Sequence, residues 1–173
     1  NILIFFLQES LNWTTKASSG TLVVVGIIAI IVQGGLIGPL VKQFGEMKLT
    51  LIGSGFILVA CSLLITAPKE NAIINIYSAV SFLAIGAGLI TPTLRALISK
   101  KLNVDKQGSI LSNLQGLQSL GGVLGIAMAG RVYDSFGPKS PFIAGSIILI
   151  FMIYLIAEGK NNNASIDQKS KAF

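Results

Sequence analysis

Residues 21–40 read Thr21-Leu-Val-Val-Val-Gly-Ile-Ile-Ala-Ile-Ile-Val-Gln-Gly-Gly-Leu-Ile-Gly-Pro-Leu40. This stretch lies within 25 consecutive uncharged residues between Lys16 and Lys42. A helix needs roughly 20 predominantly apolar residues to cross a hydrocarbon core of about 30 Å. Buried strands of soluble proteins are much shorter, at roughly 4–8 residues. The stretch therefore predicts a membrane-spanning helix.

Four further stretches repeat this pattern, each inside a run of 18 to 24 uncharged residues. The segment Ile2–Leu7 resembles the end of another span, and we expect the beginning of that span to precede residue 1. The sequence thus predicts an all-α integral membrane protein with five complete transmembrane helices and a stub of a sixth. The predicted spans are Thr21–Leu40, Leu49–Ala67, Ala72–Leu94, Gly108–Gly130 and Pro141–Ala157.

The composition of the 173 residues also indicates a lipid environment. Hydrophobic residues make up 52% of the chain and charged residues only 12%, whereas soluble domains carry about 25% charged residues. His is absent and Cys61 is the single Cys, which excludes a disulfide framework, a zinc site and His-based catalysis. Within the spans there is no Asp, Glu, Lys or Arg either. We therefore expect no cofactor, no metal and no enzymatic activity.

The positive charges predict the orientation in the membrane. Loops on alternate sides differ in Lys and Arg content, and the richer side faces the cytoplasm. One set of loops holds nine of the 13 basic residues, so we expect this set and the C-terminus to be cytoplasmic, in a bacterial inner membrane. The net charge of +6 then reflects topology, and we expect no nucleic-acid partner. The nine are Lys42, Lys48, Arg95, Lys100, Lys101, Lys106, Lys160, Lys169 and Lys171.

The spans and the polar C-terminal residues form two regions. Residues 1–157 are predicted to be a transmembrane bundle. Residues 158–173 contain three consecutive Asn residues and alternating charges, a composition that is typical of disorder. They are predicted to be a disordered cytoplasmic tail.

A short motif occurs twice. Gly38-Pro-Leu-Val-Lys-Gln-Phe-Gly45 and Gly130-Arg-Val-Tyr-Asp-Ser-Phe-Gly137 both read G-x-[LV]-x-x-x-F-G, 92 residues apart. The copies are three spans apart, so they emerge on opposite sides of the membrane. Such inverted three-helix units are common in secondary transporters. The alternative is that both copies are ordinary glycine helix ends.

The extended first copy, Gly38-Pro-Leu-Val-Lys-Gln-Phe-Gly-Glu-Met-Lys48, resembles the cytoplasmic loop motif of the major facilitator superfamily, G-x-L-a-D-r-x-G-r-k. The resemblance implies a gating loop with Gly38, Lys42, Gly45 and Lys48 at motif positions. Lys42 stands where the family has an acidic residue, so it cannot form the family's gating contacts in the same sense.

Three stretches are similar to the tetracycline/proton antiporters of this superfamily: Asn12-Trp13, Gln33-x4-Gly-Pro39 with its loop, and Gly86-x-Gly-x3-Pro92 leading to Lys106-Gln-Gly108. This resemblance implies that the chain is the C-terminal six-helix bundle of a twelve-helix transporter, with an inverted 3+3 repeat. The partners would be the lipid bilayer, a small-molecule substrate, a proton gradient and the missing N-terminal half. An acidic residue for proton coupling would lie in that half.

Neutral polar residues mark a candidate substrate cavity. In the span Gly108–Gly130, four polar side chains lie within about 60° of one direction, at 100° per residue. They are Ser112, Gln115, Gln118 and Ser119. Gln33 is a further candidate because it also matches a position in the antiporters. The alternative for all five is hydrogen bonding between helices.

Two residues near the predicted cytoplasmic end of the span Ala72–Leu94 are also notable. Pro92 removes a backbone hydrogen bond and is predicted to kink this helix as a hinge. Arg95 is expected to extend toward the cytoplasmic headgroups rather than toward substrate.

These observations predict a secondary transporter that exports small amphipathic, tetracycline-like compounds by alternating access, coupled to protons. Import of a sugar or metabolite by a facilitator is the alternative within transport, and a more polar cavity would favour it. A non-transporting membrane scaffold is the alternative outside transport, although it would not need the repeat or the polar residues.

Overall fold

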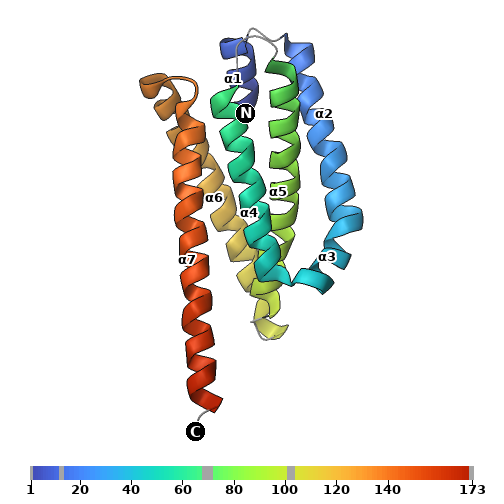
Figure 1. Cartoon of the computed structure of the whole chain (residues 1–173), viewed down its shortest axis with the longest axis vertical. Helices are drawn as coiled ribbons and strands as arrows, with labels where there is room; N and C mark the ends of the chain where they lie inside the picture. The colour runs from blue at the N-terminus through green and yellow to red at the C-terminus, as the bar shows by residue number, and fades with distance from the viewer. Residues whose placement is uncertain (1, 12–13, 68–71, 101–103, 172–173) are drawn as a thin grey trace.

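The computed structural model describes residues 2–11, 14–67, 72–100 and 104–171, and every element in these ranges is helical (Figure 1). Asn12, Trp13, Lys69 and Lys101, which the sequence predictions use, lie outside the described residues. The elements are α1 (Ile2–Leu11), α2 (Thr15–Ile31), the π-helical turn η1 (Val32–Leu36), α3 (Ile37–Phe44), α4 (Glu46–Thr66), α5 (Ala72–Lys100), α6 (Val104–Phe136) and α7 (Ser140–Lys171).

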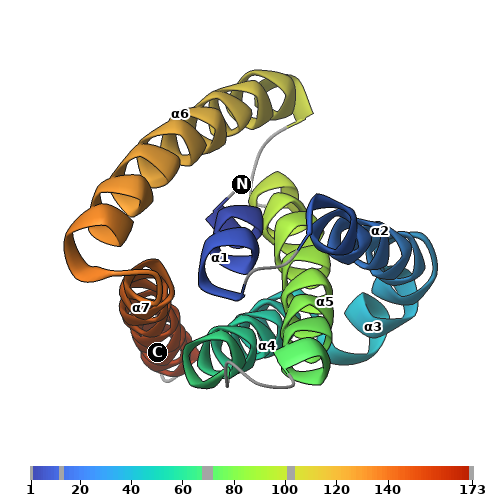
Figure 2. The ribbon, with the colours of Figure 1, turned by 90° about the horizontal axis from the view of Figure 1, so that it is seen from above.

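The long helices alternate in direction. The turn from α3 to α4, the end of α5 and the end of α7 lie at one end of the molecule, whereas the turn from α6 to α7 lies at the other (Figure 1). This arrangement places the regions of highest Lys and Arg content at the same end. Seen from above, α6 runs along the outside of the assembly and α7 lies beside α4 (Figure 2).

Helices α4 and α5 form the most closely packed pair, and small residues allow this approach. A Cβ atom added at Gly86 would lie 2.6 Å from the carbonyl oxygen of Gly53. Toward the other end of the contact, the hydroxyl oxygens of Thr50 and Thr93 lie 3.0 Å apart, and both side chains are buried. Close backbone approach through small residues and hydrogen bonds between helices are the usual means of packing in membranes.

Two apolar clusters lie on either side of this contact. The first joins α1 to α4 and α5 and contains Leu3, Phe6, Leu7, Leu64, Ile76, Ala79 and Val80. The ring of Phe6 also meets the ring of Phe142 in α7 edge to face, with centroids 5.2 Å apart. The second cluster joins η1 to α4 and α5 through Val32, Leu49 and Leu89. The segment predicted to be the stub of a span is thus a helix that packs into the bundle.

Three helices are long and apolar enough to cross a membrane: Ser18–Phe44, Glu46–Thr66 and Ile73–Lys100. They coincide with the first three predicted spans. Ser140–Ile156 is a shorter apolar helix and overlaps the fifth predicted span. The fourth, Gly108–Gly130, is helical within α6 but is not among the three, because its amides, hydroxyls and glycines lower its hydropathy. Five complete spans are therefore not established.

The exposed side chains of α6 indicate what surrounds this helix. Its large apolar side chains are 62–68% exposed: Leu117, Leu120, Val123, Leu124, Ile126 and Met128. Contiguous apolar surface of this kind is costly in water and marks contact with lipid or protein.

The C-terminal segment differs from the expected disorder. Helix α7 continues through Lys171 and extends beyond the ends of the neighbouring helices (Figure 1). Extending an existing helix requires no new nucleation, and no Gly or Pro follows Gly159. The backbone of residues 158–171 is therefore helical, while the division of the chain at residue 158 stays a prediction.

Candidate functional site

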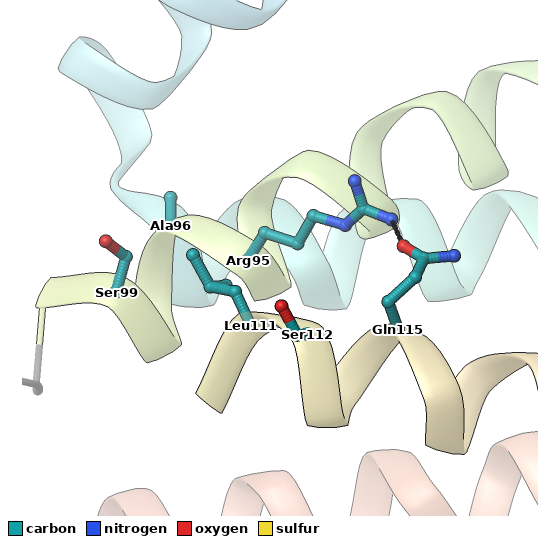
Figure 3. Close-up of a pocket in the computed structure, with 6 residues that line it drawn as sticks. All are labelled: Arg95, Ala96, Ser99, Leu111, Ser112 and Gln115. Atoms are coloured by element: carbon teal, nitrogen blue, oxygen red, sulfur yellow. Dashed lines mark hydrogen bonds between the residues drawn. The ribbon is translucent and has the colours of Figure 1, made fainter. Parts of the chain in front are cut away.

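A pocket of about 620 Å³ lies between α5 and α6 near the connection of the two helices (Figure 3). Its lining combines apolar and polar side chains from both helices: Arg95, Ala96 and Ser99 of α5, and Leu111, Ser112 and Gln115 of α6. Because the two helices are antiparallel, residues 20 positions apart in sequence meet there.

Arg95 is the central residue of this pocket. Its Nη2 donates to Oε1 of Gln115 at 2.5 Å and to Oε1 of Gln118 at 3.4 Å. Gln115 lies 11 residues into α6, about 16 Å from its start at 1.5 Å per residue. The arginine therefore reaches away from the connecting loop and along the helix pair (Figure 3).

The side chain of Arg95 points away from the nearby end of α5, while its expected contact with cytoplasmic headgroups stays a prediction. Side chains in an α-helix point toward the N-terminus of that helix. For a residue five positions before the end of α5, this direction leads away from the connecting loop, and the side chain stays exposed. The two glutamine amides then provide acceptors at that position.

The polar stripe predicted on α6 surrounds this arginine. Ser112 and Gln115 line the pocket, and Gln118 accepts a hydrogen bond from Arg95. The hydroxyl of Ser119 donates to the backbone carbonyl of Gln115 at 3.0 Å, so this hydroxyl is satisfied within its own helix. Three of the four predicted α6 residues are therefore brought together around one cation.

Gln33 lies elsewhere and does not line this pocket. It belongs to η1, beside α5, where a Cβ added at Gly88 would lie 3.8 Å from Nε2 of Gln33 and 3.1 Å from Cγ1 of Val32. Single π-helical turns inside α-helices often occur at functional sites. The two glycines of Gln33-Gly-Gly35 are small residues that such a turn tolerates. Hydropathy patterns do not detect a π-helical turn.

Pro92 interrupts the backbone hydrogen bonding of α5 at the level of η1. Proline has no N–H, so it cannot donate to the carbonyl of the residue four positions earlier, which is Gly88. The irregular backbone of η1 and the interrupted hydrogen bonding of α5 therefore lie side by side. This position makes Pro92 a candidate hinge.

The loop motif forms the turn between α3 and α4. Gly45 has a φ of 75° and its N–H donates to the carbonyl of Val41 at 2.9 Å, which ends α3. Gly38 and Lys42 lie on α3. Lys48 lies in the first turns of α4 and lines a second pocket of about 400 Å³, together with Phe44, Gly45, Glu46, Met47, Leu51 and Leu97.

The sequence prediction missed an ion pair beside this turn. Glu46 accepts a hydrogen bond from Nζ of Lys100 and forms a salt bridge with it. The Glu46 side chain is only 13% exposed, whereas Lys100 is 67% exposed. The acidic group that is absent at position 42 is thus present four residues later, where it joins α4 to α5.

The second copy of the motif ends in a similar turn. Gly137 has a φ of 89°, and its N–H donates to the carbonyl of Tyr133 at 2.9 Å, as Gly45 does to Val41. The two turns lie at opposite ends of the molecule (Figure 1). Glycine with positive φ is also a common helix end, so this likeness concerns two turns rather than two three-helix units.

The described residues contain no group of three or more His, Cys, Asp or Glu side chains that could hold a metal ion. The chemistry available to the site is therefore that of one guanidinium, amides and hydroxyls beside apolar side chains. These groups bind and orient molecules.

Comparison with known proteins identifies relatives. The family model of the Major Facilitator Superfamily matches residues 1–126. A class H tetracycline resistance protein from Pasteurella multocida is 26% identical over 133 residues, which cover 77% of this chain and 32% of that protein. A class C tetracycline resistance protein from Escherichia coli is 25% identical over 130 residues, which cover 75% of this chain and 32% of that protein.

A more distant relative is the hippocampus abundant transcript 1 protein of Homo sapiens, 22% identical over 131 residues, which cover 76% of this chain and 26% of that protein. No solved structure matches the chain. The chain thus spans about a third of the length of the curated relatives, and the predicted similarity to tetracycline resistance proteins is confirmed. Since the family model covers well over half of its residues, the chain belongs to the Major Facilitator Superfamily, whose members are secondary transporters and not enzymes.

Proposed function

We propose that the protein is a secondary transporter that exports small amphipathic compounds by alternating access, driven by the proton gradient. The observation that carries this proposal is the pocket between α5 and α6, in which a polar stripe faces an arginine within otherwise apolar helices. The resistance function named for the bacterial relatives supports export.

Polar groups in such helices require a reason. An amide or hydroxyl exposed to hydrocarbon is costly, whereas the same group beside a water-filled cavity is not. Gln115 and Gln118 are both exposed in the structure. A substrate path along this face of α6 would provide the aqueous environment that the two amides need.

We further propose that α1 to α7 form the C-terminal half of a twelve-helix transporter, with five complete spans, an inverted 3+3 repeat and a cytoplasmic C-terminus. The matched segments cover about a third of the relatives, and the resemblance of the loop motif and of the Gly86–Pro92 stretch to the antiporters supports the assignment to the C-terminal half. No acidic residue lies in the first three predicted spans, which are Thr21–Leu40, Leu49–Ala67 and Ala72–Leu94. Proton coupling would then use a carboxylate outside them, in the N-terminal half.

Gating in this proposal uses two features. The turn with Gly38, Lys42, Gly45 and Lys48 would change its contacts between inward-open and outward-open states. Pro92 would serve as the hinge of α5, since the helix lacks a backbone hydrogen bond there.

The test uses the intact protein in inverted membrane vesicles, with a proton gradient established across the vesicle membrane. Gln115→Ala and Gln118→Ala are expected to change the substrate range or to lower the initial efflux rate per molecule. Asn113→Ala is the matched control, because Asn113 is an exposed amide on the opposite face of the same helix. If membrane abundance falls with Gln115→Ala while activity per molecule stays constant, the polar stripe is structural and the proposal loses its main support.

A second candidate is the import of a polar metabolite, and the position of Arg95 favours it. A charged group in the pocket is more useful for a hydrophilic substrate than for a purely apolar one. Comparing uptake by intact cells with uptake by inverted vesicles distinguishes the two directions. Accumulation in cells that requires the protein would support import and contradict export.

A further inference from the structure

We infer that the pocket between α5 and α6 binds an anionic group, the carboxylate or phosphate of an amphipathic molecule, through Arg95. This inference rests on the proposed function in that it names the chemical class of the molecule. It is carried by the charge balance of the pocket, by its hydrogen-bond donors and by its apolar wall.

The charge of Arg95 is not balanced within the described part of the chain. Its hydrogen-bond partners are the neutral amides of Gln115 and Gln118, and no described carboxylate forms an ion pair with it. Glu46, at the same end of the molecule, is already paired with Lys100. A guanidinium stays charged in proteins, and Arg95 is exposed in the structure. An anion can therefore reach the guanidinium and would balance its charge.

The polar groups around the arginine are rich in donors. Both glutamine amides use their Oε1 atoms to accept from Nη2, so their NH₂ groups remain for other partners. In the close-up, the amide nitrogen of Gln115 points away from Arg95 (Figure 3). The guanidinium itself also has its Nε and Nη1 hydrogens, and Ser112 adds a hydroxyl to the lining. Such a set matches a ligand that only accepts, as carboxylate and phosphate oxygens do.

The remaining lining consists of Ser99 and two apolar side chains, and the apolar pair indicates what the rest of the ligand is. Ala96 and Leu111 lie beside the polar groups. The volume of about 620 Å³ lies within the range of roughly 300–1,000 Å³ for small-molecule sites. A compact hydrophobic molecule with one anionic group would therefore match both the polar and the apolar parts of the lining. A cationic group would be repelled by Arg95, so anionic molecules are expected to bind best and cationic ones worst.

The experiment compares two aromatic molecules that differ in charge. The intact protein is reconstituted in phosphatidylcholine nanodiscs, and the Kd values of 2-naphthoate and 2-naphthamide are measured by isothermal titration. The carboxylate is expected to bind about tenfold more tightly than the amide, since hydrogen bonds to charged groups contribute this much. Arg95→Gln is expected to abolish the difference and Arg95→Lys to preserve part of it. Arg131→Gln is the matched control, because Arg131 is an exposed arginine at the far end of α6.

A lipid headgroup could supply the same anionic oxygens, and a second arm distinguishes this source. The protein is purified from membranes that contain phosphatidylglycerol, and the retained lipid is quantified by mass spectrometry. Retention that falls in Arg95→Gln but not in Arg95→Lys, with no preference for naphthoate, assigns the site to lipid phosphate. A preference for naphthoate that depends on Arg95 assigns it to a soluble amphiphile.

The inference is overturned if neither naphthoate preference nor lipid retention depends on Arg95. A merely structural arginine would weaken the binding of both aromatic molecules equally and lower the melting temperature. The transport assay separates this outcome from failure of the proposed function. If Arg95→Gln still exports neutral compounds, the transporter proposal stands without an anion site. If the unmodified protein exports nothing, the transporter proposal itself fails.

Discussion

Glu46 in the first turn of α4 and Lys100 in the last turn of α5 form an ion pair across 54 residues of sequence. The pair lies directly after the glycine turn that ends α3, at the same end of the molecule as the end of α7 (Figure 1). The Glu46–Lys100 pair therefore connects the loop motif to α5, the helix that carries Arg95.

Reversing the charge of one partner tests whether this pair takes part in gating. Glu46→Lys and Lys100→Glu are each expected to lower the transport rate, with modest effects on the order of a few-fold, because Lys100 is largely exposed and solvent screens the pair. The double exchange is expected to restore the rate. Transport by reconstituted protein measures all three variants. A double variant that is as slow as the worse single variant would contradict a role for the pair itself.

Adding a side chain at Gly86 is expected to separate α4 from α5. The Cβ atom of Gly86→Ala would lie 2.6 Å from the carbonyl oxygen of Gly53 and from Cγ1 of Ile57. Overpacking of this kind lowers the free energy of unfolding by about 1–3 kcal/mol. Thermal unfolding of the purified protein in detergent measures the change. Gly55→Ala is the control, since no atom lies within 4 Å of its added Cβ; equal losses from both variants would refute the close contact.

Replacing Pro92 by Ala restores an N–H that can donate to the carbonyl of Gly88. An internal proline costs a helix about 3 kcal/mol, so Pro92→Ala is expected to raise the melting temperature. If α5 bends at this position during transport, the same variant is expected to be slower than the unmodified protein. A variant that is more stable and equally fast would assign Pro92 to packing alone.

Cysteine labelling tests the predicted orientation. In a Cys61→Ala background, Lys42→Cys on α3 and Lys139→Cys in the turn after α6 place exposed thiols at opposite ends of the molecule. An impermeant maleimide is expected to reach position 139 from outside intact cells and position 42 only from the cytoplasmic side. The reverse pattern would invert the topology.

The sequence predicted those parts of the fold that depend on the solvent. Hydrocarbon excludes charges, so the membrane-spanning parts of α2 with α3, of α4 and of α5 are visible as runs without Lys, Arg, Asp or Glu, namely Thr21–Leu40, Leu49–Ala67 and Ala72–Leu94. The polar stripe of α6 was also visible, because helical periodicity alone brings Ser112, Gln115 and Gln118 to one face. The helical continuation of α7 past residue 158 was not visible, because composition does not report that the preceding helix removes the need for nucleation.

The contacts between helices could not be predicted in the same way. The direction of Arg95 depends on acceptors 20 and 23 residues away, and the partner of Glu46 is 54 residues away. The turn η1 depends on Val32 packing against Gly88 of another helix. Local sequence patterns carry no information on which residues meet across such separations, although Arg95, which ends a charge-free run three residues after Pro92, was a signal that could have been followed.

The pair of hydroxyls at Thr50 and Thr93 has a mechanical consequence. Thr93 directly follows Pro92, and its partner lies one turn after Glu46 at the start of α4. If α5 bends at its proline, this contact would carry the movement to the beginning of α4 and to the glycine turn at position 45 that precedes it. The proposed hinge and the proposed gating turn would then move together.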